Sequence, residues 1–461
     1  MSATPSGLPW APALAVLERG LLQRDEAARV LLLAAVAGEH VLLLGPPGTA
    51  KSELARRLQC LLPGARYFER LLTRFTVPEE LFGPLSLRAL EEDRYERLTE
   101  GYLPAAEVVF LDEVFKANSA ILNTLLSLLH ERQFDNGSQR LAVPLRCLVG
   151  ASNEQPQDDS LLAFYDRFLL RVPVLPVDDA HFTQLLTDPP ASLTEVPPAA
   201  QLAPQQLQAL REQAPTVALG EPVLAHLLAA RNQASQSEYP VSDRRWRQLV
   251  TLLQVQAASQ QAKVVQPWDL WVLPFVLASG PVEVPAWREW FLHRVARTEP
   301  MPLDGLERAV QAFEQQLDIE RRAPADVQDD NAGKLALARA IVGPDAARDD
   351  MVRITSDRAQ HHFSRIHIAA RVAQCDALLL QLQSLRDDTE TLARQIITEA
   401  RAYAWLPPSW RDAICNEHTA RCDRLHNWCQ RLQAARDGFA ELPVSAEAPP
   451  TEPAPVTWSA H

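Results

Sequence analysis

The sequence predicts an α/β fold with a parallel sheet, followed by regions that are almost entirely helical. Up to about residue 175, short apolar runs alternate with helical patterns, which is typical of a parallel sheet covered by helices. From residue 205 to about 290, and again from about 300 to 440, helical patterns dominate. The strand candidates are HVLLL (40–44), ARYFERLL (65–72), EVVFLD (107–112) and RCLVGAS (146–152).

The remaining elements follow in order along the chain. Helices over 13–38 precede the first strand, and a proline-rich break separates the sheet region from the helical one over 173–205. Within that break, DAHFTQLL (179–186) predicts a short helix, and EYPVSDRRW (238–246) predicts a turn in the middle of the helical region. The long patterns after residue 300 predict a long antiparallel helical hairpin.

Composition excludes several classes of protein. The 461 residues carry a net charge of −13, which argues against a general binder of nucleic acid or of anionic membranes. The N-terminus lacks a basic start and an apolar signal core, and the longest apolar stretch, Val30–Ala37, is too short to cross a bilayer. Six cysteines in so long a chain do not indicate a disulfide framework. We therefore expect a cytoplasmic, reduced protein without a membrane anchor.

The stretch GPPGTAKS follows the first strand and precedes a helical pattern. Glycines between a strand and a helix let backbone N–H groups point at a phosphate, Lys51 should reach the outer phosphates of ATP, and Ser52 should hold Mg²⁺. A chance glycine turn is the alternative, and the flanking strand and helix argue against it. The predicted phosphate-binding residues are Gly45, Pro46, Pro47, Gly48, Thr49, Ala50, Lys51 and Ser52.

Ala50 departs from the usual phosphate-loop pattern, which has glycine at that position. At the turn that enters a helix we expect a negative φ, and alanine then fits at little cost. Alanine at position 50 therefore weakens the match to the sequence pattern, but it does not argue against phosphate binding by the loop.

Polar side chains follow two further strands. Asp112 and Glu113 end an apolar strand at the edge where the phosphate loop also lies, so Asp112 should hold the Mg²⁺ shell and Glu113 should activate the attacking water. Asn153 ends the next strand and is a candidate ligand of the γ-phosphate or the water. Taken alone, the two acids fit a solvated strand end equally well, and Asn153 fits a turn asparagine better.

Together these motifs resemble an AAA-type ATPase of the MoxR group, and within it the RavA type. The resemblance covers about 13–260 and rests on GPPGTAKS, LLTRFTVPEELFGPLSL, RYERLTEGYLPAAEVVFLDEVFKANSAILNTLLSLLHERQF, ASNEQP and EYPVSDRRW. It implies an AAA+ αβα core over 1–175 and an all-α lid over 176–295. The helical patterns that follow predict a helical C-terminal domain over 296–442. We expect 443–461, which lacks periodicity, to be a disordered tail.

Site residues carry over from the resemblance. Asn153 matches the sensor-1 position, Arg167 matches an arginine finger supplied to a neighbouring subunit, and Arg244 matches the sensor-2 arginine, with Arg245 as the adjacent candidate. Without the resemblance, a surface ion pair or a packed stem would explain these arginines better. The family also places a helix-2 insert at about 80–104 and a pre-sensor hairpin, and Asn136-Gly137 is a strong hairpin signal.

The resemblance further implies a hexameric ring, a von Willebrand factor A protein as partner, and a client complex that is remodelled with ATP and Mg²⁺. RavA-type proteins also carry a β-rich module, for which only MVRITSD (351–357) offers a period of two. We therefore do not expect this chain to bind the partners that RavA-type proteins bind through their β-rich module. Two competing functions remain open, a nucleic-acid motor of the same clade and a non-catalytic nucleotide-binding scaffold.

For two other clusters of residues, we favour a structural role over a functional site. Tryptophan-rich stretches around 267–291 are more often core than a site. A cysteine and histidine stripe has helical spacing, and a metal site using one turn of it would lack a second ligand cluster, so we expect helix packing. The stripe consists of Cys415, His418, Cys422, His426 and Cys429.

Overall fold

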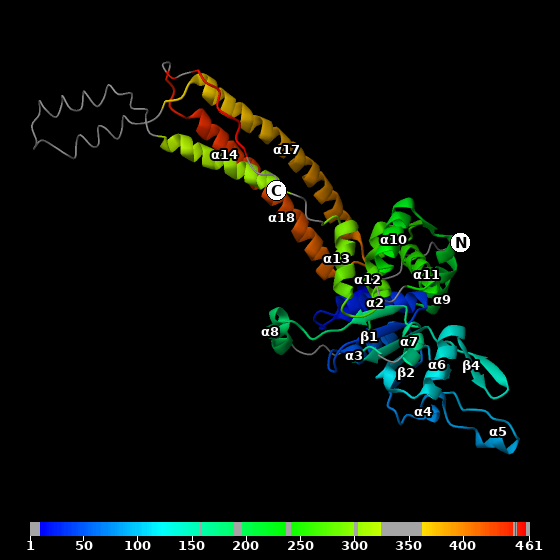
Figure 1. Cartoon of the computed structure of the whole chain (residues 1–461). Coiled ribbons are helices and arrows are strands. Elements are labelled where there is room, and N and C mark those ends of the chain that lie inside the picture. Colours follow the sequence, from blue (N-terminus) through cyan, green and yellow to red (C-terminus); the bar gives the residue numbers. More distant parts are fainter. Residues whose placement is uncertain are drawn as a thin grey trace, which may run out of the picture. The chain divides into compact units, whose positions relative to one another are not determined.

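The computed structural model of the chain describes residues 10–156, 159–188, 196–236, 241–298, 303–323, 362–445, 448 and 450–457. The chain forms two compact units, one made of residues 1–298 with 400–414 and the other of 299–399 with 415–461 (Figure 1). Among the described residues, no helix is long and apolar enough to cross a membrane.

The first unit is built on a five-stranded parallel sheet in the order β2-β3-β6-β1-β7. The four predicted strands are confirmed. The fifth, β7, was missed because its short sequence LRVP leads directly into the proline-rich break. The strands are β1 Val41–Leu44, β2 Tyr67–Leu71, β3 Val108–Asp112, β6 Cys147–Ser152 and β7 Leu170–Pro173.

The register of the central strands aligns their carboxyl ends. Leu44 at the end of β1 lies beside Ser152 of β6 and Pro173 of β7, and Leu111 of β3 lies beside Gly150. The residues that follow β1, β3 and β6 therefore emerge at one edge of the sheet, and the residues that precede β1 emerge at the opposite edge.

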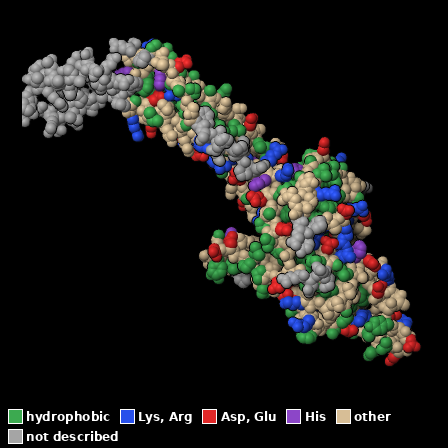
Figure 2. Space-filling view, in the orientation of Figure 1, with side chains coloured by type: hydrophobic (Ala, Val, Ile, Leu, Met, Phe, Trp, Pro, Cys, Tyr) green, Lys and Arg blue, Asp and Glu red, His purple; other side chains and the backbone are tan. Residues whose placement is uncertain are grey.

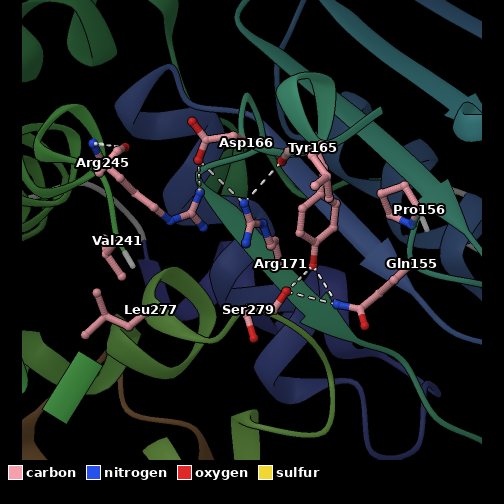
Figure 3. Close-up of a pocket in the computed structure, with 11 residues that line it drawn as sticks. Gln155, Pro156, Tyr165, Asp166, Arg171, Val241, Arg245, Leu277 and Ser279 are labelled. Carbon is pink, nitrogen blue, oxygen red and sulfur yellow. Dashed lines mark hydrogen bonds and ion pairs between the residues drawn. The ribbon is translucent and has the colours of Figure 1, made fainter. Parts of the chain in front are cut away.

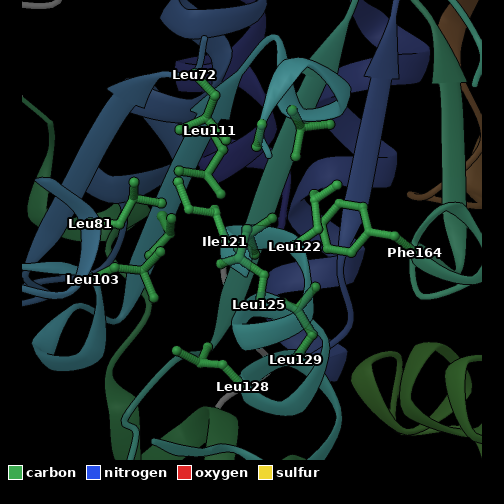
Figure 4. Close-up of a cluster of buried hydrophobic side chains, with 14 of the residues drawn as sticks. Leu72, Leu81, Leu103, Leu111, Ile121, Leu122, Leu125, Leu128, Leu129 and Phe164 are labelled. Atoms are coloured by element: carbon green, nitrogen blue, oxygen red, sulfur yellow. The ribbon is translucent and has the colours of Figure 1, made fainter. Parts of the chain in front are cut away.

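Helices cover both faces of this sheet (Figure 1). On one face, α6 packs Ile121, Leu125 and Leu128 onto Val109 and Leu111 in a cluster that excludes water (Figure 4). These apolar residues recur every three or four positions, which gives α6 its buried stripe. The helices of this core are α1 Trp10–Glu18, α2 Asp25–Ala37, α3 Lys51–Cys60, α6 Ser119–Glu131 and α7 Asp159–Tyr165.

The predicted insert and hairpin are present and contact each other. The insert contains α4 (Pro78–Phe82) and α5 (Leu87–Glu91), and the hairpin pairs β4 (Gln133–Asn136) with β5 (Gln139–Ala142). The side chain of Asn136 accepts from the backbone N–H of Arg97 at 2.6 Å and donates to its carbonyl at 3.1 Å. The hairpin tip is thereby fastened to the returning arm of the insert.

The segment after the sheet is helical, with a small departure from the prediction. A two-stranded parallel pair of β8 (Ala218–Leu219) and β9 (Val264–Val265) interrupts a region predicted to be helical throughout. With two residues each, these strands are too short to leave a periodic signal. The helices are α8 Asp179–Thr187, α9 Pro204–Gln213, α10 Glu221–Ala234, α11 Asp243–Ser259, α12 Leu273–Leu277 and α13 Val284–Arg294, and short 3-10 turns lie at Leu103–Ala105, Val114–Lys116, Pro198–Ala200, Ala214–Thr216 and Pro267–Val272.

Helix α8 differs from the other helices because none of its residues is buried. Its apolar side chains, Phe182, Leu185 and Leu186, are exposed. Figure 2 shows much hydrophobic green on the lobe where Figure 1 labels α8. Gln23 links it to the core through hydrogen bonds to Asp178 and His181.

Aromatic residues join 400–414 to the first unit. Trp410 packs against Trp271, Phe275 and Phe291, and its indole N–H donates to Glu26. This confirms the interpretation of the tryptophan-rich stretches as core, because a buried tryptophan contributes a large apolar area.

Among the described residues, the second unit contains α14 Asp304–Arg322 and most of two long helices, α17 Arg365–Ala402 and α18 Pro408–Ala440, whose ends near residues 400–414 belong to the first unit. Helices α17 and α18 run antiparallel, since Arg436 pairs with Asp376 far from the connection between them. In the cysteine and histidine stripe, Cys429 is buried in the apolar cluster of this unit and His418 is almost fully buried. Both placements are those of a packing stripe. The strand candidate 351–357 lies outside the described residues.

The prediction of a disordered tail is wrong for part of the tail. Val444 forms a parallel bridge with Phe363, and the Ala454 carbonyl accepts a hydrogen bond from Arg371 at 2.8 Å. Val456 packs on the apolar cluster of the second unit. A proline-rich segment without periodicity can still be held in place when a helical bundle offers it partners, and the sequence does not show those partners.

The contact between hairpin and insert leads to a first prediction. Replacing Asn136 by alanine removes both hydrogen bonds to Arg97, a loss of about 1–3 kcal/mol that is confined to this contact. We expect trypsin to cleave the insert at Arg94 or Arg97 several times faster, while the melting temperature of the chain changes little. Gln139→Ala, on the exposed face of the same hairpin, is the control. Equal cleavage of both variants and the wild type would show that the two segments do not support each other.

Candidate functional site

The loop between β1 and α3 is shaped by its glycines. A Cβ on Gly45 would lie 2.1 Å from the carbonyl oxygen of Val174, so the close approach of the chain after β7 requires glycine there. Gly48 has a φ of +81° with open space around it, so its backbone conformation alone favours glycine. The loop is closed by Thr49, whose hydroxyl donates to the Pro46 carbonyl at 3.0 Å.

Ala50 does not have the negative φ that we expected. It has a φ of +68° and a ψ of +23°, in the left-handed region, at the N-cap of α3. The chain must reverse there so that the helix begins with its N–H groups facing the loop, and this turn requires positive φ whatever the residue. Alanine in this conformation costs about 1–2 kcal/mol. The site therefore stores strain at the position where the usual pattern has glycine.

Lys51 and Ser52 form the first turn of α3 behind this loop. The Lys51 ammonium is nearly buried and donates to the carbonyls of Gly45 and Pro46, both at 2.7 Å. Burial lowers its pKa, against the opposing effect of Asp112 and Glu113. An ammonium that is held over a loop of backbone N–H groups, at a helix N-terminus, is suited to bind a polyphosphate.

The acids at the end of β3 lie beside Asn153. Glu113 has a φ of +53°, and its backbone N–H donates to Asp112 Oδ1 at 3.0 Å. Its carboxylate accepts a hydrogen bond from Asn153 Nδ2 at 2.7 Å on one oxygen and pairs with Lys116 Nζ at 3.2 Å on the other. The three predicted polar residues are therefore brought together, and both oxygens of Glu113 are held.

Two further residues of this region were missed by the sequence analysis. Lys116 was missed because its distance to Glu113 depends on the turn Val114–Lys116. Arg24 is nearly buried and donates to the Thr49 carbonyl at 3.0 Å and to the Leu175 carbonyl at 2.7 Å. It braces the phosphate loop against the chain that leaves β7. A basic residue before a helix does not by itself indicate in the sequence that it contacts a distant loop.

A divalent cation fits the oxygen groups at this edge. Ser52 lies in the first turn of α3, directly after the loop. Asp112 ends β3, which is separated from β1 by β6 alone. Hydroxyl and carboxylate oxygens are ligands that Mg²⁺ prefers. Among the described residues, no group of three or more His, Cys, Asp or Glu is placed to hold a metal ion.

The two predicted arginines lie elsewhere, in one cavity of about 250 Å³. Arg167 has a buried Nε without a hydrogen-bond partner in the part of the chain that the structure describes. Arg244 donates to the Asp166 carboxylate at 2.6 Å. The cavity is also lined by Gly38, Glu39, His40, Leu129, His130, Arg132 and Gln248.

Arg244 and Arg245 have different surroundings. Arg245 is buried and donates to the carbonyls of Val276, Phe168 and Leu169, so it fastens α11 to the chain between α7 and β7. Arg244 keeps about a third of its side chain exposed. Arg244 is therefore the more exposed of the two arginines.

The arginine cavity and the phosphate loop lie at opposite ends of β1. Gly38, Glu39 and His40 precede this strand, and the loop follows it. A strand of this length separates its two ends by roughly 13 Å. In this arrangement Arg167 and Arg244 face away from the phosphates that their own loop would bind.

Comparisons with known proteins agree with this architecture. Residues 11–212 match the family model described as the MoxR domain in the MoxR-vWA-beta-propeller ternary systems, and residues 222–291 match the AAA lid domain. Together with the sheet order and the helical region after it, these matches support a MoxR-family AAA+ ATPase.

Similar proteins include two from Methanocaldococcus jannaschii. Uncharacterized protein MJ0079 is 41% identical over 253 residues, which cover 55% of this chain and 65% of that relative. Uncharacterized protein MJ0812 is 55% identical over 151 residues, which cover 32% of this chain and 40% of that relative. The match thus spans less than two thirds of either relative. Chaperone MoxR1 of Mycobacterium tuberculosis is 26% identical over 166 residues, which cover 35% of this chain and 43% of that relative. A crystal structure of a proposed ATPase from Cytophaga hutchinsonii has a TM-score of 0.49 and 15% identity, over 62% of this chain and 94% of that chain.

The left-handed conformation of Ala50 gives a sharp test. In Ala50→Gly the relief of about 1–2 kcal/mol exceeds the entropy cost of about 0.4–1 kcal/mol, so we expect an equal or higher melting temperature. In Ala50→Val a β-branched side chain meets a positive φ, and we expect a clear loss of stability. Thermal unfolding of both variants measures this. A less stable glycine variant beside a nearly neutral valine variant would indicate a negative φ.

Glu39 gives a prediction for pH. Burial raises its pKa to about 7, against the opposing effects of Arg132 and Gln248. Because the folded chain binds this proton more tightly than the unfolded chain, the contribution of Glu39 to stability is full below its ordinary pKa of 4.5 and is lost as pH rises through about 7. We expect up to about 2 kcal/mol of such loss. Melting temperatures from about pH 5 to 8 should therefore fall more for the wild type than for Glu39→Gln, and parallel curves would contradict this.

Proposed function

We propose that this chain, as a MoxR-family AAA+ ATPase, hydrolyses ATP with Mg²⁺ and uses the cycle to remodel a protein complex. The observation that carries the proposal is the convergence of Lys51, Asp112, Glu113 and Asn153 at one sheet edge. The loop would bind the phosphates, Lys51 would neutralise their charge, and Ser52 with Asp112 would hold the metal ion. Glu113, held by Asn153 and Lys116, would orient and deprotonate the attacking water.

The same geometry supports an oligomer. An arginine that stabilises the transferred phosphoryl group must contact it, and the cavity of Arg167 and Arg244 lies at the other end of β1 from the loop. We infer that both arginines serve the nucleotide of a neighbouring copy. Such head-to-tail contacts form a ring when the rotation between copies closes, which is compatible with the hexamer that the resemblance implies. In this role Arg167 would have to leave its cavity when a neighbour docks.

The partners follow from the family description. It names ternary systems of MoxR, vWA and beta-propeller proteins, so we propose a von Willebrand factor A protein as a partner of this chain and a β-propeller protein as a second. The similar MoxR1 is called a chaperone, which is in line with action on a protein client. The RavA subtype and the cytoplasmic location stay predictions.

The insert offers a surface to a protein client. Leu87, Leu90 and Tyr95 are exposed on it, and the hairpin supports it through Asn136. A nucleic-acid motor would need free cations here. The hairpin arginines are already engaged, because Arg140 pairs with Asp135 and Glu131, and Arg132 donates to the carbonyls of Leu145 and Gly38. The engaged arginines of the hairpin thus favour a protein client over a nucleic acid at the hairpin.

The proposal predicts the effect of one conservative change. Glu113→Gln should lower ATP turnover by about 10²–10⁴-fold and leave nucleotide binding intact, because the amide cannot accept the proton. Glu107→Gln, at the other end of β3, is the matched control and should keep turnover within about twofold. Turnover per chain, measured without nucleic acid, should also rise with protein concentration and then saturate.

Unchanged turnover in Glu113→Gln would favour the non-catalytic scaffold instead. Turnover that appears only when DNA or RNA is added would favour the nucleic-acid motor.

A further inference from the structure

A second cavity, of about 350 Å³, lies where α7 and β7 meet α11 and α12 (Figure 3). None of the phosphate-loop residues lines it. Its volume is at the lower end of small-molecule pockets. It is therefore large enough for a small ligand and separate from the nucleotide site.

The cavity contains more positive than negative charge. Arg171 and Arg245 both line it and are both more than nine-tenths buried. Asp166 is the carboxylate that faces them, at 3.8 Å from Arg171 and 3.6 Å from Arg245. The same carboxylate pairs at 2.6 Å with Arg244, so three guanidinium groups share one half-exposed acid. Figure 3 shows Arg171 and Arg245 converging on Asp166.

Arg171 is the least satisfied of these groups. Its Nε is buried and has no hydrogen-bond partner among the residues that the structure describes. Its other nitrogens make only long hydrogen bonds, to the carbonyls of Ala278 at 3.5 Å and Tyr165 at 3.3 Å. The guanidinium stacks 3.8 Å from the Tyr165 ring centre, which offsets part of the burial cost. A buried cation with unused donors favours an anionic ligand.

Two other features of the wall suit an anion. Ser242, which lines the cavity, is the N-cap of the 17-residue helix α11, so the positive end of the helix dipole lies there. On the opposite side, Tyr165 and Gln155 are fixed in place, because the Tyr165 hydroxyl donates to the Ser279 carbonyl at 2.7 Å and Gln155 Nε2 donates to the same carbonyl at 2.9 Å. The walls are therefore ordered.

We propose that this cavity binds a small dianion, inorganic phosphate or a short dicarboxylate, with Arg171 as its main ligand. Arg171 belongs to β7, whereas Ser242 and Arg245 belong to α11. A bound dianion would therefore bridge the sheet and the helical region after it, and would strengthen their contact. The proposal does not depend on ATP hydrolysis.

The test uses the full chain carrying Lys51→Ala, which weakens phosphate binding at the loop. Melting temperature and titration calorimetry are measured with sodium phosphate and, separately, with sodium succinate, at constant ionic strength set with sodium chloride. We expect saturable stabilisation by at least one of the two dianions. Adding Arg171→Gln should raise the dissociation constant of the bound dianion at least tenfold. Arg88→Gln, an exposed arginine of the insert, is the control and should leave it unchanged.

A second variant guards against misfolding of Arg171→Gln. Val241 lines the cavity, and Val241→Trp should fill it while leaving every charge in place. Loss of dianion binding in both variants supports the site. Equal binding in all variants, or no binding of either dianion at tens of millimolar, would overturn it. If neither dianion binds but Arg171→Gln changes the mass of the assembled ring, the cavity holds an acidic side chain of a second copy, and the small-molecule site is wrong.

Discussion

The parallel pairing of β1 between β6 and β7 is the constraint on which the rest of the molecule depends. Because the three strands run in the same direction and end level, the loop after β1 and Asn153 after β6 emerge at one edge. Asp112 and Glu113 at the end of β3 join them through the β3–β6 pairing. The same polarity places Glu39 and the two candidate arginines at the opposite edge. A chain built this way separates the phosphate site from the arginines that would complete it.

Two strained backbone positions lie at the phosphate edge, among the seven non-glycine residues with positive φ in the described part of the chain. Ala50 and Glu113 both have left-handed backbone conformations, and neither is glycine. Such conformations persist when their surroundings fix them, and they often occur at functional sites. Here Lys51 and Arg24 hold the loop through its own carbonyls, while Asn153 and Lys116 hold the Glu113 carboxylate. The stored strain thus coincides with the groups proposed to bind and hydrolyse ATP.

Sequence patterns were informative wherever burial or turn chemistry leaves a local signal. Four of the strands of the sheet, the hairpin at Asn136-Gly137 and α8 could be predicted from apolar runs and turn residues. The short strand β7 could not, since four residues before prolines do not show a period. The sign of φ at Ala50 depends on how the loop enters α3, and residue identity alone pointed the wrong way.

Adjacency in space was the least predictable feature of the site. The resemblance matched Arg244 to the sensor-2 position and left Arg245 as the adjacent candidate, and sequence did not reveal that Arg245 is buried against three carbonyls. Lys116, Arg24 and Arg171 gave no signal because their partners are distant or depend on a single turn. The ordering of Val444 against Phe363 was likewise hidden, because a tail without periodicity can be ordered by the bundle beside it.

The central claim is that one copy supplies the phosphate loop and its neighbour supplies the arginine. Its most direct test mixes two variants that we expect to be inactive, Lys51→Ala and Arg167→Ala, after dissociation and reassembly of the proposed ring. In a random equal mixture about one interface in four combines an intact loop with an intact arginine. The account predicts that mixing restores roughly a quarter of wild-type ATP turnover. If the mixture stays as inactive as its parts while rings of mixed composition are present, the arginine does not act on a neighbour and the account is wrong.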